Sequence, residues 1–274
     1  AKLGQILRED KFHAVRSEAA KVLAKIGEPE ARAELIASSE NQKHAATRKA
    51  VVQALASLHT PESRETLWKM AQSEKNPAIL ATIVETWSAR PGEPVVSEAL
   101  KKHLAASSYQ STLELAAIKA LRAQDDESAV PAVLARLQQP HELRGRDAST
   151  AFEALAFLAR RPTNPNRDAV RDFLAEKLSD PRRDWRVAAA KALGTLRDPK
   201  ALGLLDLMLA ISGGDRIDPV REAAAKSAQD IRAGLESPAD LKNLWDRVQQ
   251  LQKKSEDQAK EIEALKKKPQ TAKK

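Results

Sequence analysis

One apolar pattern recurs seven times along the chain, and its regular interval restricts the fold more than any other feature of the sequence. Each copy places mostly apolar or small residues at positions 0, 4, 5, 8 and 11, which together form one stripe of an α-helix. The copies follow one another at intervals of 32, 32, 34, 34, 38 and 35 residues. Their residues at position 0 are Val15, Thr47, Ile79, Leu113, Asp147, Trp185 and Val220. Such self-similarity indicates a stack of repeated units.

A further helical stretch precedes these copies, as in Leu202/Leu205/Leu209, so each unit is expected to be a pair of helices. Turn and start signals such as Asp198-Pro199 separate the two helices, because proline is tolerated in the first turn of a helix. No pair can cover its own apolar stripe, whereas stacked pairs share one continuous core. The sequence therefore predicts an all-α superhelix, or solenoid, of about seven helix pairs over residues 1–235. An aromatic content of 3% also disfavours a β-rich fold.

The motifs Val15-Arg16-x-x-Ala19-Ala20-x-x-Leu23 and Arg186-x-x-Ala189-Ala190-x-x-Leu193-Gly194 resemble HEAT repeats of the short, bilin-lyase-like type. The resemblance extends over residues 1–235. It implies the α-solenoid fold and little about function, because this fold serves many functions.

The last part of the chain changes its spacing. Apolar residues over residues 236–266 alternate at intervals of three and four, which predicts an amphipathic heptad helix of the coiled-coil type. The candidate seam consists of Leu241, Leu244, Val248, Leu251, Ile262 and Leu265, with polar Ser255 and Gln258 at its centre. This helix can pair in a homodimer or fold back on the last repeat. Residues 267–274 are expected to form a disordered basic tail.

A narrower resemblance rests on Asp10-Lys-Phe12-x-x-Val15-Arg16-x-Glu18-Ala19-Ala20, which is similar to the opening of the C-terminal helical-repeat region of bacterial aminopeptidase N-like zinc metallopeptidases. Residues 109–123 and Phe152-Glu153-Ala154-Leu155 resemble the middle repeats of that region. The resemblance implies a bowl that packs against the catalytic domain of the same polypeptide, limits access and binds a substrate peptide or partner.

Catalytic motifs are absent from the sequence. The aminopeptidase resemblance implies a zinc site of the form His-Glu-x-x-His, but the single His-Glu pair here, His141-Glu142, has Gly145 where the second histidine would stand. The same single pair is too few for the HEAT-repeat di-iron hydroxylases, which need several. With no cysteine, no Gly-x-Ser-x-Gly motif and no phosphate-binding glycine loop, we expect no enzymatic activity, no cofactor and no metal in this chain. Zinc would belong to a catalytic domain that is not present.

A polar ladder is the candidate binding surface. Position 6 of the second helix is polar in every unit, although positions 4, 5 and 8 beside it are almost all apolar. The ladder residues are Lys21, Gln53, Glu85, Lys119, Glu153, Lys191 and Lys226. Because second helices line the concave side of a HEAT stack, we expect these side chains to follow the groove, either as a solvated stripe or as a docking surface. Their mixed signs favour a protein or peptide partner over a phosphate backbone.

Aromatic and histidine side chains have structural interpretations. Trp87 and Trp185 occupy core positions of their units, while Trp68 is expected to have no aromatic neighbour that would make a stacking platform. The five histidines are expected at the surface or at helix ends.

The formal charge of +8 is spread along the chain, with acidic residues among the basic ones. The arginine-dense stretch from Arg144 to Arg197 is the best nucleic-acid candidate, but pairing between arginine and aspartate explains most of it. Nucleic acid is therefore the less favoured partner. The sequence has no apolar run long enough to span a membrane, and the lack of a signal-peptide core favours the cytoplasm over secretion.

Three functions follow. The leading hypothesis is a non-catalytic C-terminal HEAT-repeat domain of an aminopeptidase N-like metallopeptidase, and the alternatives are a freestanding protein-interaction scaffold and a HEAT-type nucleic-acid binder.

Overall fold

A computed structural model describes residues 2–106, 108–139, 143–211, 218–235, 247–255 and 258 of the chain. The fourteen numbered helices form seven consecutive pairs, and the described residues contain no β-strand. The helices are α1 (Lys2–Glu9), α2 (His13–Ile26), α3 (Pro29–Ser38), α4 (Ala45–Leu58), α5 (Pro61–Ser73), α6 (Pro77–Thr86), α7 (Pro94–Ala105), α8 (Thr112–Gln124), α9 (Val130–Gln138), α10 (Gly145–Leu158), α11 (Arg167–Lys177), α12 (Arg183–Leu196), α13 (Leu202–Ile211) and α14 (Pro219–Leu235). Short 3-10 segments are η1 (Trp87–Ala89), η2 (Tyr109–Ser111), η3 (Glu127–Ala129) and η4 (Pro199–Ala201).

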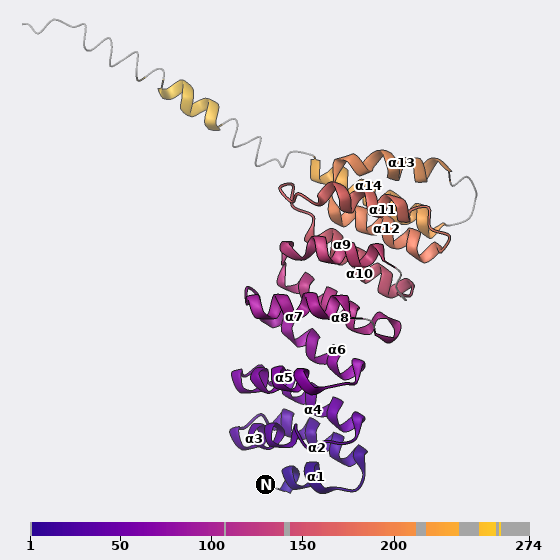
Figure 1. Ribbon diagram of the computed structural model, residues 1–274. Helices are drawn as coiled ribbons and strands as arrows, with labels where there is room; N and C mark the ends of the chain where they lie inside the picture. Colours follow the sequence, from indigo (N-terminus) through magenta and orange to yellow (C-terminus); the bar gives the residue numbers. More distant parts are fainter. Residues whose placement is uncertain are drawn as a thin grey trace, which may run out of the picture.

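The pairs stack into one elongated solenoid with α1 and α14 at opposite ends (Figure 1). The seven copies of the sequence pattern coincide with the even-numbered helices α2 to α14, so the predicted HEAT-like superhelix of seven helix pairs is confirmed. Prolines begin several helices as expected, including Pro29, Pro61, Pro77, Pro94 and Pro219.

The core is a continuous layer of small and apolar side chains from the even-numbered helices. Positions 4 and 5 of the units are fully buried in pairs such as Val51-Val52 and Ala189-Ala190. Alanine at these positions allows successive helices to approach closely. Larger side chains, such as the fully buried Phe152, fill the space left between the two layers.

Trp87 and Trp185 are buried, which agrees with their predicted packing role. The ring of Trp68 lies 4.8 Å from that of Trp87, but the two rings are tilted by 42° and are not stacked. Trp68 is only half-buried, and the guanidinium of Arg90 lies 5.5 Å above its ring. The pair is part of the packing between α5 and η1, because one of its two rings is inaccessible.

The turn before α12 contains a carboxylate, that of Asp180, whose hydrogen bonds depend on pH. Asp180 accepts hydrogen bonds from the backbone and the side chain of Arg182, and the guanidinium of Arg182 lies 3.3 Å from the ring centre of Trp185. The Arg182 hydrogen bonds lower the pKa of the Asp180 carboxyl from 3.8 to about 2.

Replacing Asp180 by asparagine is expected to make the free energy of unfolding fall less steeply as the pH is lowered. A carboxyl whose pKa is lower in the folded state stabilises the fold above its unfolded pKa, and that contribution is lost as the pH falls from about 4 to 2. We expect Asp180→Asn to lower the free energy of unfolding by about 1–2 kcal/mol at pH 7, and by little at pH 2. Urea unfolding at pH 7, 4 and 2.5 measures this, and Arg182→Gln should show the same flattening. Parallel curves for the wild type and Asp180→Asn would contradict the assignment.

None of the helices in the described residues is long and apolar enough to cross a membrane. Residues 247–255 form a further helix in which Val248 and Leu251 are exposed. The other seam residues, Leu241, Leu244, Ile262 and Leu265, lie outside the described residues, as do the basic tail and His141-Glu142.

Candidate binding groove on the concave face

The even-numbered helices form the inner layer of the solenoid. Each packs extensively on the next even-numbered helix along the stack, whereas successive odd-numbered helices touch one another less. The ladder residues at position 6 belong to this layer and are exposed, except for the half-buried Glu153.

The structure brings some ladder residues together. Lys119 of α8 forms an ion pair of 3.1 Å with Glu85 of α6, which joins the third and fourth units. Lys21 instead pairs with Glu18 of its own helix at 2.6 Å. Toward the other end, Glu153, Lys191 and Lys226 line one hollow of about 750 Å³. Glu85 and Lys119 are thus in direct contact, and the last three ladder residues share one hollow.

This hollow, which we call the inner groove, lies over α10, α12 and α14. Its lining residues are Glu153, Phe157, Arg160, Arg161, Pro162, Lys191, Gly194, Thr195, Arg197, Ala223, Lys226, Ser227 and Asp230. Five of them are basic and two are acidic, so the lining is positive. Small side chains occur where α12 meets α14, and the half-buried ring of Phe157 adds an apolar wall.

The basic residues of the inner groove fall into two groups. Arg160 and Arg161 are engaged by Asp125, at 2.7 and 2.6 Å, and Arg160 also stacks over the Phe157 ring at 3.7 Å. Lys191, Arg197 and Lys226 are exposed, and within the described part of the chain their side chains form no ion pair. These three cations are therefore available to an acidic ligand.

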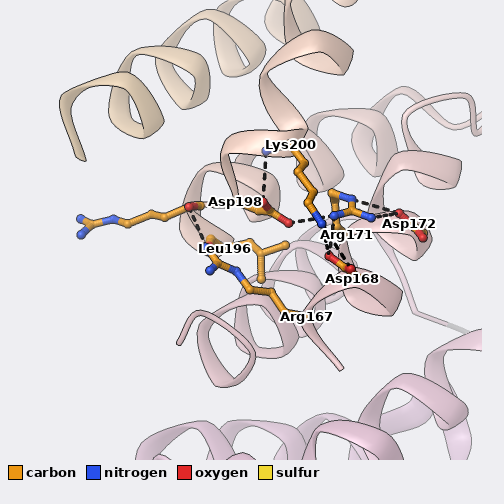
Figure 2. Close-up of polar contacts among 8 residues, drawn as sticks. Arg167, Asp168, Arg171, Asp172, Leu196, Asp198 and Lys200 are labelled. Carbon is orange, nitrogen blue, oxygen red and sulfur yellow. Dashed lines mark hydrogen bonds and ion pairs between the residues drawn. The ribbon is translucent and has the colours of Figure 1, made fainter. Parts of the chain in front are cut away.

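Within the described part of the chain, pairing with aspartate occurs at four of the ten arginines of the arginine-dense stretch, which is less than expected; the four are Arg160, Arg161, Arg171 and Arg182. Figure 2 shows Arg171 between Asp168, Asp172 and Asp198, with distances of 2.6, 2.8 and 3.1 Å from its guanidinium nitrogens to their carboxylate oxygens. Asp198 also accepts a hydrogen bond from the backbone of Lys200 and so begins η4. These interactions tie α11 to the turn after α12, so the carboxylates of this cluster already have cationic partners.

Arginine side chains at position 1 donate hydrogen bonds to the turn that precedes their helix. Arg48 and Arg186 each donate to the backbone carbonyls five and six residues before them, those of Lys43 and Gln42 and those of Pro181 and Asp180. Arg48 also binds Glu74 of the next unit at 2.9 Å. Arg48 therefore contacts both the preceding turn and the next unit, whereas the hydrogen bonds of Arg186 go to the preceding turn.

Four of the histidines lie at helix ends, as expected. His13 begins α2, His44 and His59 flank α4, and the rings of His13 and His44 stack at 4.0 Å. His103 lies in the last turn of α7, where it is half-buried near Trp87, and burial lowers its pKa. In the residues that the structure describes, no group of three or more histidine and carboxylate side chains could hold a metal ion.

One buried carboxylate lies away from the inner groove. Glu114 of α8 is fully buried, and burial raises its pKa despite an ion pair of 2.8 Å with Arg136. It lies in the core between units, where the ion pair joins α8 to α9.

Beyond the three ladder residues, the sequence pattern did not indicate the lining of the inner groove, and Arg197 and Phe157 are two of the lining residues that it missed. Arg197 ends α12 in the left-handed conformation, with φ of 53°. Phe157 stands at position 10 of its unit, outside the apolar stripe. The sequence signal that could have identified Phe157 is the presence of an aromatic residue just outside the apolar stripe.

Comparison with known proteins supports the repeat type. A family model described as HEAT repeats matches residues 1–87, and a model described as the PBS lyase HEAT-like repeat matches residues 185–206. No curated protein sequence matches the chain. The structure of human deoxyhypusine hydroxylase in complex with glycerol is similar at 19% identity and a TM-score of 0.40, over 84% of this chain and 83% of that one. An engineered protein is similar at 18% identity and a TM-score of 0.36, over 85% and 96%.

Proposed function

We propose that the chain is a helical-repeat scaffold that binds a polypeptide in the inner groove. The observation that carries this proposal is the presence of three exposed cations, Lys191, Arg197 and Lys226, which have no ion-pair partner among the described residues and surround one concave lining. Phe157 and the small residues between α12 and α14 supply apolar contact area beside them. An acidic peptide segment with apolar side chains has the chemistry that this lining complements.

A polypeptide suits the inner groove better than a nucleic acid. Glu153 and Asp230 belong to the same lining, and their carboxylates would repel a continuous phosphate backbone. A peptide can place its own acidic residues near the lysines and its basic or neutral residues near these two carboxylates.

Charge reversal in the inner groove tests the proposal. Peptides from an unbiased library are selected on the purified chain, and their affinities are measured by fluorescence anisotropy. Lys191→Glu/Lys226→Glu is expected to weaken the selected acidic peptides at least about tenfold, which corresponds to roughly 1.4 kcal/mol. The matched control is Lys21→Glu/Lys119→Glu, which makes the same charge change on the ladder away from the groove and should retain affinity.

Two results would contradict this function. One is equal loss of affinity in the groove variant and the control, which would indicate a general charge effect. The other is tight binding of a DNA or RNA oligonucleotide that falls steeply between about 50 and 200 mM salt and is lost in the groove variant, as a nucleic-acid binder requires.

We also propose a more specific identity for the chain, which rests on the sequence motifs of the first and middle units. Asp10–Ala20 and Phe152–Leu155 support a non-catalytic C-terminal domain of an aminopeptidase N-like metallopeptidase, with zinc held only by a separate catalytic domain. An antibody raised against residues 1–235 tests this on a lysate of the source organism. A band much heavier than the 30.0 kDa chain, with zinc-dependent aminopeptidase activity, is expected. A band at the mass of the chain would leave the freestanding scaffold, with a heptad-helix homodimer as its proposed assembly.

A further inference from the structure

Two lysines of the inner groove occupy equivalent positions in neighbouring units. Lys191 of α12 and Lys226 of α14 both stand at position 6, and both line the hollow of about 750 Å³. Both residues are exposed, and neither forms an ion pair with a described residue. We call Lys191 and Lys226 the lysine pair.

The helices that carry the lysine pair approach each other closely beside it. A Cβ atom on Gly194 of α12 would lie 3.0 Å from Cα of Ser227 in α14. Gly194 follows Lys191 by three residues, and Ser227 follows Lys226 directly. Because each ammonium group stands on a flexible four-carbon stem, both can reach one group that is bound between the two helices.

Another contact of the ladder shows that side chains at position 6 of neighbouring units can meet. Glu85 of α6 and Lys119 of α8 form an ion pair there, with 3.1 Å between Oε1 and Nζ. In α12 and α14 both positions hold lysine, so two like charges replace the ion pair. An anion between the two lysines would supply the negative charge that Glu85 supplies to Lys119.

The two carboxylates of the inner groove do not compensate the lysine pair. Glu153 of α10 accepts a hydrogen bond of 3.3 Å from the hydroxyl of Ser149 on its own helix. Asp230 follows Lys226 by four residues on α14. In the described part of the chain, neither carboxylate forms an ion pair with either lysine. The lysine pair is therefore open to an anionic group of a ligand.

We infer that the lysine pair binds a phosphorylated side chain, phosphoserine or phosphothreonine, of the polypeptide that occupies the inner groove. A phosphomonoester carries a charge of about −1.5 to −2 at pH 7 and has three strong acceptor oxygens, so one group can accept hydrogen bonds from both lysines. A carboxylate carries a single charge and leaves one lysine uncompensated. The inference rests on the proposed function, because the phosphate belongs to the bound peptide.

A single phosphate avoids the repulsion that disfavours a nucleic acid in this groove. A continuous phosphate backbone would also pass the carboxylates of Glu153 and Asp230, which belong to the same lining. A phosphorylated residue places its charge at one point, and the neighbouring residues of the peptide can be neutral or basic. The lysine pair therefore fits a phosphopeptide better than an oligonucleotide.

Two peptide libraries test the inference on the full chain. One carries phosphoserine at a fixed central position, the other carries serine there, and the flanking residues are random. Selected peptides are synthesised with phosphoserine, serine and glutamate at the centre, and their affinities are measured by fluorescence anisotropy. We expect phosphoserine to bind at least about tenfold more tightly than glutamate. Lys191→Gln and Lys226→Gln should each reduce this preference to about twofold or less, because one ammonium group remains.

The control variant is Lys21→Gln/Lys119→Gln, which removes two ladder lysines outside the inner groove and should keep the tenfold preference. The inference is overturned if phosphoserine and glutamate peptides bind equally. If the acidic peptides still lose affinity in Lys191→Glu/Lys226→Glu, the proposed function then stands without a phosphate site.

Three other results would also overturn the inference. A preference for phosphoserine that survives both single substitutions would place the phosphate away from the lysine pair. Failure of both libraries to yield a peptide that needs the inner groove would remove the proposed function together with the inference. Tighter binding of a 5′-phosphorylated oligonucleotide than of the phosphopeptides, lost in Lys191→Gln and Lys226→Gln, would assign the lysine pair to a nucleic acid.

Discussion

Replacing Phe152 by alanine is expected to lower the free energy of unfolding by about 3–5 kcal/mol, the range for deleting a buried aromatic ring. Phe152 is fully buried in α10, and its ring meets those of Phe173 and Trp185 edge to face at 5.6 and 5.3 Å. The surrounding helices are rich in alanine, whose side chains cannot move to fill the space left by the ring. The cavity should therefore persist, which places the cost in the upper part of the range.

Urea unfolding followed by circular dichroism measures this loss. Phe12→Ala is the matched control, because the same atoms are removed from an exposed side chain, and we expect a change within about 0.5 kcal/mol. Since solenoids can unfold unit by unit, the fluorescence of Trp185 should report the loss directly. Equal small effects of both substitutions would show that the three rings do not form the core of these units.

The sequence was sufficient for the architecture because the fold is repetitive. Position 5, for example, is buried as Ala20, Val52 and Ala190 in three units, and each copy confirms the helical phase that the others indicate. A residue that departs from the apolar pattern, such as Asp147 at position 0, therefore did not disturb the assignment of the helix pair. The position of the ladder on the second helices follows from the same phase.

The inner groove could not be predicted to the same extent. Its concavity depends on how each unit rotates on the one before it, and this rotation is set by side-chain packing between units that are far apart in sequence. Arg160, for instance, binds Asp125 of the preceding unit, 35 residues away, whereas Lys191 has no such acidic partner in the described residues. Which cations are paired and which are free is therefore a property of the assembled stack.

Gly194 is expected to be the least tolerant glycine of the solenoid helices toward alanine. An added Cβ atom would lie 2.6 Å from Oγ, 2.8 Å from Cβ and 3.0 Å from Cα of Ser227, so α12 and α14 would have to separate. Alanine favours a helix over glycine by up to about 1 kcal/mol, but overpacking at a rigid backbone costs about 1–3 kcal/mol. We expect Gly194→Ala to be destabilising by about 1–2 kcal/mol in urea unfolding.

Gly203→Ala provides the opposite expectation in the adjacent helix, α13. No atom lies within 4 Å of the Cβ position there, so only the helix propensity changes and stability should rise by about 0.5–1 kcal/mol.

Ser227→Ala combined with Gly194→Ala should restore only part of the loss, because the new methyl group would still press on the Cβ atom and the backbone of residue 227 after the hydroxyl is removed. Full restoration would show that the hydroxyl alone limits the approach of the two helices, and a stabilising Gly194→Ala would show that α12 and α14 are not in close contact. Because Gly194 also lines the inner groove, a destabilised Gly194→Ala should bind the selected peptides more weakly, which links the spacing of these helices to the proposed function.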